Sequence, residues 1–214
     1  MFSPGPLLLA AALVGILHMS APDHWATLII LGRVSKWDRS RLMGVGAMTA
    51  VGHVTLSILL GFAVVEVGII FSHQASLYIT EGTGAIMVAG GLIYGARELM
   101  SSKTEDYERE TQEKISKGQG TLGRRFRYFA VLGAALSPDL SILPIFLLAA
   151  PIGVAFAIDT AIVFAIASIA SLLAFLILGS AGLAKAFEKI PPKYNDALVG
   201  FVIAAVGVYI LLVG

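Results

Sequence analysis

The chain is 214 residues long, and 57% of its residues are hydrophobic while only 14% are charged. Soluble domains carry about 25% charged residues, so this composition excludes a water-soluble globule and predicts an integral membrane protein with the lipid bilayer as its solvent. The net charge of +1 argues against a nucleic-acid partner, and the absence of cysteine excludes disulfides, thiolate metal sites and cysteine-held iron–sulfur clusters.

Six apolar stretches are long enough to cross a bilayer, since a helix needs about 20 residues to span the hydrocarbon core. They are residues 5–31, 42–65, 77–98, 128–149, 153–182 and 195–213. The N-terminal stretch lacks the basic residues of a signal peptide, so we interpret it as a retained helix. We therefore expect an all-α fold with three helices in residues 1–98, a charged cytoplasmic linker at 99–127, and three helices in residues 128–214.

The first span contains three groups that are costly inside a membrane: His18, Asp23 and His24. Such groups mark a functional site by default, and their nitrogen and oxygen donors suit nickel, cobalt, zinc, copper or iron. On an unbroken helix, residues six apart lie about 120° apart around the axis. Pro22 removes a backbone donor and disfavours helical angles at the preceding residue. We expect a helix break there that brings His18 and His24 together.

The second and fourth spans add further polar groups. His53 lies in the apolar run of the second span and is the natural fourth ligand. In the fourth span, Pro138-Asp139 echoes the Pro22-Asp23 of the first, which predicts a second helix break and two inverted three-helix repeats around one site at mid-depth. For Asp139 the residues leave three roles open: it neutralises the ion, carries a coupling proton, or caps a half-helix.

The basic residues predict the orientation of the chain. All 15 of them fall in the loops that follow the first, third and fifth spans, and the loop around residues 66–76 contains none. Cytoplasmic loops near helix ends retain Lys and Arg. We therefore expect a multi-pass protein of the plasma membrane with both termini outside the cytoplasm.

The first span resembles a known family. His18 followed after four residues by Asp23-His24 resembles the H-x4-D-H signature of the nickel/cobalt transporters (NiCoT), and its context is even more similar to the related NicO group of the LysE-like superfamily. The resemblance implies that His18, Asp23, His24 and His53 bind the transported ion. This chain departs from the NiCoT members in having six expected helices rather than eight, and it lacks the histidine-rich loop of some exporters.

Together these features predict a membrane transporter of divalent transition-metal cations, with Ni²⁺ or Co²⁺ as the substrate rather than a cofactor. An intramembrane metalloprotease would need the motif H-E-x-x-H, which the chain lacks, so no enzyme activity is expected. Two alternatives stay open: a transporter of the same fold that carries an anion such as sulfite or an organic acid, and a b-type haem protein. Both a monomer and a homo-oligomer are compatible with the prediction.

Overall fold

The computed structural model describes residues 5–100, 113, 133, 138–181 and 192–213, without the side chains of 22, 23, 68–81, 192 and 213. Every regular element in that part of the chain is helical. The elements are α1 (Gly5–Ser20), α2 (Pro22–Val34), α3 (Arg39–Met100), the 3₁₀ turn η1 (Leu140–Ile142), α6 (Leu143–Ala149), α7 (Val154–Ser180) and α9 (Pro192–Val213).

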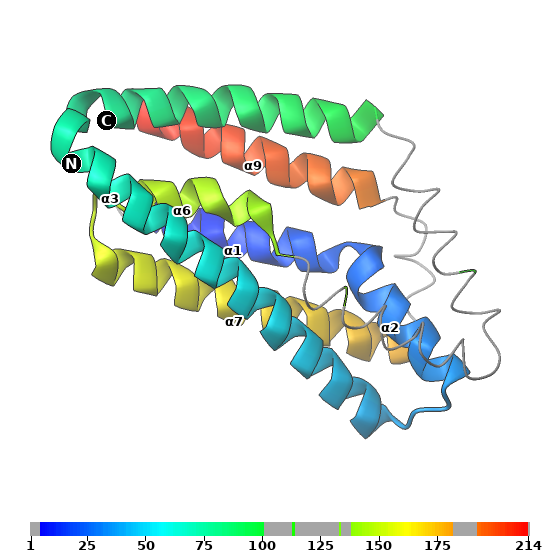
Figure 1. Ribbon diagram of the computed structural model, residues 1–214. Helices are drawn as coiled ribbons and strands as arrows, with labels where there is room; N and C mark the ends of the chain where they lie inside the picture. The colour runs from blue at the N-terminus through cyan, green and yellow to red at the C-terminus, as the bar shows by residue number, and fades with distance from the viewer. Residues whose placement is uncertain (1–4, 101–112, 114–132, 134–137, 182–191, 214) are drawn as a thin grey trace.

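The long helix α3 is a hairpin of two antiparallel limbs, the first at Arg39–Val67 and the second at 82–100. Figure 1 shows it reaching one end of the bundle, reversing direction and returning. The two limbs have different neighbours, as this path requires. Gly61 in the first limb contacts Phe146 of α6, whereas Gly91 in the second limb contacts Gly200 of α9. The prediction of a non-helical loop at 66–76 is wrong. The backbone there stays helical, since the stretch contains no proline and only one glycine to end a helix.

Four helical stretches in the described residues are long and apolar enough to cross a membrane. They are Gly5–Val34, Arg39–Val67, Val154–Ser180 and Lys193–Leu212, and they coincide with the first, second, fifth and sixth expected spans. Large hydrophobic side chains cover the outside of the helices, as at Ile86 (72% exposed) and Ile166 (65% exposed). Extensive exposed apolar surface is typical of a membrane interaction, so the fold is that of an all-helical membrane protein.

The other two expected spans, at 77–98 and 128–149, are not among these four stretches. Residues 77–98 lie within α3, mostly in its second limb. The expected span at 128–149 falls largely outside the described residues, and its described end consists of η1 and the short helix α6. The linker at 99–127 also lies outside them, apart from residues 99, 100 and 113. The division into two three-helix units therefore stays a prediction.

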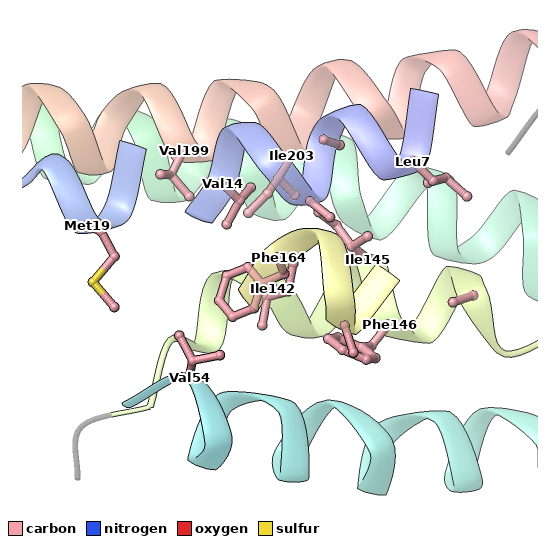
Figure 2. Packing of buried hydrophobic residues seen from close by; sticks show 14 of the residues in the cluster. Leu7, Val14, Met19, Val54, Ile142, Ile145, Phe146, Phe164, Val199 and Ile203 are labelled. Atoms are coloured by element: carbon pink, nitrogen blue, oxygen red, sulfur yellow. The ribbon is translucent and has the colours of Figure 1, made fainter. Parts of the chain in front are cut away.

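The core that holds the end of α1 in place lies between α1, α6, α7 and α9. Val14, Phe146, Phe164 and Ile203 belong to one cluster of buried hydrophobic side chains (Figure 2). A Cβ at Gly15 would lie 2.5 Å from the Ser168 hydroxyl oxygen, so α1 approaches α7 closely only because residue 15 has no side chain. This packing fixes the helix whose last turn carries His18.

The second limb of α3 packs on α9 through direct backbone contact. A Cβ at Gly91 would lie 2.5 Å from the carbonyl oxygen of Gly200, and a Cβ at Gly200 would lie 2.6 Å from the nitrogen of Gly95. Small residues allow helices in membranes to approach this closely, because van der Waals contact replaces the hydrophobic driving force that water would provide. At Gly91 and Gly200 this interface leaves no room for a side chain.

Candidate functional site

A break between α1 and α2 lies at the centre of the site. α1 ends at Ser20 and α2 begins at Pro22, while Ala21 between them is extended, with φ −62° and ψ 134°. Proline disfavours helical angles in the residue before it and is well tolerated as the first residue of a helix. The chain therefore starts a new helix at Pro22 in a different direction (Figure 1).

The carbonyl groups that the break would leave without partners are satisfied locally. The Ala21 N–H donates to the His18 carbonyl at 3.2 Å, and the indole N–H of Trp25 donates to the Ser20 carbonyl at 2.9 Å. Trp25 is itself 1% exposed and stacks on Phe175 of α7. Because a buried unpaired carbonyl is costly, these contacts stabilise the break.

Three histidines from three helices meet beside this break. His18 ends α1, His24 lies in the first turn of α2, and His53 lies in the first limb of α3. The ring centroids of His18 and His24 are 4.6 Å apart, and the His53 ring lies 5.3 Å from each of them. His53 is 2% exposed. The structure thus gathers three of the four expected ligands into one mutually contacting cluster.

The geometry of the cluster is partly that of a metal site. The Nε2 atoms of His18 and His24 are 3.1 Å apart, and two imidazoles bound to one ion at about 2.0–2.1 Å would place their nitrogens about 2.9–3.4 Å apart. No group of three His, Asp or Glu side chains within the described ranges is disposed to hold an ion as it stands. His18 and His53 lie stacked, with 22° between their planes. Since imidazole binds a metal in its ring plane, one ring must turn before three nitrogens converge.

Asp139 approaches the cluster from the second half of the chain. Its Oδ1 lies 3.9 Å from Nδ1 of His18, and the side chain is 1% exposed. The same oxygen caps η1 by accepting hydrogen bonds from the backbone N–H of Ser141 at 2.9 Å and from the Ser141 hydroxyl. The capping role left open by the sequence is therefore present, and so is proximity to the histidines.

Asp23, the remaining expected ligand, belongs to the first turn of α2 by its backbone. Its side chain lies outside the described atoms. A ligand role for Asp23 therefore stays a prediction.

Two cavities reach different members of the cluster. A cavity of about 720 Å³ lies between the limbs of α3, α6 and α9, with His18 and Asp139 in its wall and mainly apolar residues elsewhere. A much smaller pocket of about 10 Å³ touches His24 and His53, together with Met19 and Thr49. The small pocket has room for about one water-sized group. His18 thus lines the wide cavity, and the other two histidines line the small pocket.

The sequence did not single out Ser57 or Ser141, which organise the polar contacts of Asp139. Ser57 follows His53 by four residues, so both lie on one face of α3, and its hydroxyl donates to the His53 carbonyl at 2.9 Å. The i, i+4 spacing from a histidine was the available signal. Ser141 follows Asp139 by two residues, the spacing of an Asx turn.

Comparisons of the chain with family models, with curated proteins and with solved structures find no match.

Proposed function

We propose that this protein moves a divalent transition-metal cation, nickel or cobalt, across a membrane, and that His18, His24 and His53 bind the ion in transit. The observation that carries the proposal is the mutual contact of three imidazole rings, 4.6–5.3 Å apart, from three helices. Imidazole nitrogens suit nickel, cobalt, zinc, copper and iron. Polar groups of this kind inside membrane helices are rare because they are costly, so their convergence favours a functional site over packing.

The wide cavity supports transport rather than a static metal site. It brings His18 and Asp139 into the wall of a space of about 720 Å³, so an ion has room to arrive at the cluster and to leave it. The need for one ring to turn also fits an ion that exchanges. In our proposal Asp139 neutralises the ion or carries a coupling proton, and Asp23 adds a carboxylate ligand from α2.

We further propose the six-span arrangement in two inverted repeats, with breaks at Pro22 and Pro138 and the basic loops in the cytoplasm. Support comes from Figure 1, where the α2–α3 junction, the end of α3, the end of α7 and the start of α9 lie at one end of the bundle. Described basic residues at these positions include Arg33, Arg39, Arg97 and Lys193. A single cysteine at Ser116 in this cysteine-free chain should resist impermeant thiol reagents in intact cells, and ready labelling would contradict the orientation.

The geometry supports neither the b-type haem protein nor the anion transporter. A haem iron with two axial histidines needs their nitrogens about 4 Å apart, twice a metal–imidazole bond of about 2 Å, with a flat macrocycle between them. The histidine rings here contact one another directly. An anion would favour a cationic wall, and no Lys or Arg is among the described residues that line the wide cavity.

Isothermal titration of nickel and cobalt into the purified protein tests the site. His18→Ala and His24→Ala should each lower the affinity by more than the roughly 10–100-fold that loss of an outer partner costs, because fewer donors remain to replace the ion's water shell. His53→Ala should show a milder or metal-selective loss. His73→Ala is the matched control, since the fourth histidine lies 20 residues beyond His53 in the sequence.

Flux of the same ions into liposomes should follow the affinities. If wild-type protein binds no nickel or cobalt, or if all three histidine variants bind as tightly as wild type with their helicity intact, the proposed function is wrong.

A further inference from the structure

A single buried hydroxyl joins the two halves of the site. Ser57 is 0% exposed, and its Oγ donates to the carbonyl of His53 at 2.9 Å while accepting the backbone N–H of Asp139 at 2.8 Å. A hydroxyl has one donor and two acceptor positions, so it can make both bonds at once. Asp139 is thereby held beside the turn of α3 that contains His53, although Ser57 and Asp139 are 82 positions apart in the sequence.

In its ionised form, the carboxylate held in this way needs a positive partner. Its Oδ1 is capped by Ser141, whereas its buried Oδ2 has no hydrogen-bond partner among the described residues. An ionised carboxylate in an apolar interior is very costly unless a charge or donors compensate it. The nearest group that can bring positive charge is His18, whose Nδ1 lies 3.9 Å from Oδ1, together with any cation that His18 binds.

The two nitrogens of His18 face in different directions. Nδ1 lies on the Asp139 side, and Nε2 lies 3.1 Å from Nε2 of His24. A metal-binding imidazole commonly directs its second N–H to a carboxylate, which fixes both the tautomer and the orientation of the ring. Asp139 Oδ1 lies on the Nδ1 side of His18 at 3.9 Å, the distance of an ion pair rather than a hydrogen bond. A small turn of either side chain would bring the two groups to hydrogen-bond distance, leaving the Nε2 lone pair on the side of the cluster.

We propose that Ser57 is a positioning residue, which holds Asp139 behind His18 so that His18 presents Nε2 to the ion shared with His24 and His53. This inference rests on the proposed function for its effect on metal binding. Its effect on the His18 tautomer does not depend on metal.

The test compares Ser57→Ala with Thr160→Ala. Thr160 is also 0% exposed, and its hydroxyl donates to the carbonyl four residues earlier, that of Phe156, at 2.8 Å; it lies in α7 and has no bond to Asp139. Both variants should lose thermal stability, Ser57→Ala more than Thr160→Ala, because it also leaves the Asp139 N–H without an acceptor. Ser57→Ala should also lower nickel affinity about 10–100-fold, the range for loss of an outer partner, whereas Thr160→Ala should bind as wild type does.

The decisive readout uses metal-free protein labelled with ¹⁵N-histidine. The chain has only four histidines, so each signal can be assigned by removing one residue. Wild-type His18 should carry its proton on Nδ1, and both Ser57→Ala and the isosteric Asp139→Asn should shift it to a mixture of tautomers. Ser57→Thr, which keeps the hydroxyl, should restore the wild-type signal.

An unchanged His18 tautomer in Ser57→Ala and Asp139→Asn would overturn the inference, even if nickel affinity fell. If Ser57→Ala does not fold, the Asp139→Asn signal decides. If wild-type protein binds no nickel at all, the proposed function fails, and the tautomer of the metal-free protein still shows whether Ser57 and Asp139 orient His18.

Discussion

The first limb of α3 and its second limb join neighbouring helices by opposite means. In the second limb, Gly91 meets Gly200 of α9 with no side chain between the two backbones. In the first limb, His53 meets the rings of His18 and His24, and Ser57 bonds to the Asp139 backbone. The contact at Gly91 depends on the absence of side chains, whereas the contacts of His53 and Ser57 are made by polar side chains.

This difference distinguishes an interface that supports the fold, between the second limb of α3 and α9, from the candidate functional site at the histidines. The backbones at Gly91 and Gly200 can pack this closely in one arrangement only, because any atom added between them would meet another backbone atom. The histidine cluster instead lies beside a helix break, and His18 borders a cavity of about 720 Å³, so there is space next to the cluster that the glycine interface lacks. In the proposed function the site exchanges its ion, and a close-packed neighbouring interface would let it do so without loss of the fold. Changes in the two regions should therefore have different consequences.

The largest effect on folding is expected for Gly91→Ala. The new Cβ would lie 2.5 Å from the Gly200 carbonyl oxygen, and the backbone there can relieve the overlap only if α3 and α9 move apart. Overpacking of this kind costs about 1–3 kcal/mol, so the unfolding temperature followed by circular dichroism should fall. Protein that remains folded should bind nickel with wild-type affinity.

Gly90→Ala is the matched control for that substitution. A Cβ at Gly90 meets nothing within 4 Å, and both substitutions gain the same helix propensity, about 1 kcal/mol. Gly90→Ala should therefore be neutral or stabilising. Equal stability of the two variants would contradict the view that the α3–α9 contact is a rigid support.

Pro22→Ala should change the folding stability less than Gly91→Ala does, and the nickel affinity more. Alanine restores a backbone N–H, so α1 and α2 can join into one helix, on which His18 and His24 lie about 120° apart. Nickel affinity measured by titration should fall at least about tenfold, by analogy with loss of an outer partner. The unfolding temperature should stay constant or rise.

Pro151→Ala, in the turn between α6 and α7, controls for loss of a proline elsewhere and should leave nickel affinity unchanged. Wild-type affinity in Pro22→Ala would show that the break does not serve the site.

Much of the fold can be inferred from residue patterns, because the constraint is local. Apolar stretches long enough to span a bilayer occur at the positions of four described helices, and length and hydropathy depend on consecutive residues only. The prediction of a loop at 66–76 was wrong because it, too, depended on consecutive residues only. A reversal without proline and with a single glycine can remain helical, and the sequence alone offers no signal that distinguishes a loop from a bent helix there.

The site was predictable where its parts are close in sequence. His18, Pro22 and His24 lie within seven residues, so the known effect of proline on the preceding residue was sufficient to expect the two histidines to meet. The contribution of Ser57 was not predictable, since its partner Asp139 lies 82 residues away. Serine is common in apolar helices, and its spacing of four residues from His53 places it on the same helix face without indicating a partner in the second half of the chain.

The sequence by itself determined that the protein is apolar and helical, that a proline interrupts the chain between two histidines, and that costly polar groups lie in apolar segments. Only the tertiary structure decided which of these groups meet. Contact between His18, His53 and Asp139 depends on how α1, α3 and the turn before η1 pack, and that packing arises from many weak van der Waals contacts spread over the whole bundle. No short stretch of sequence contains this information.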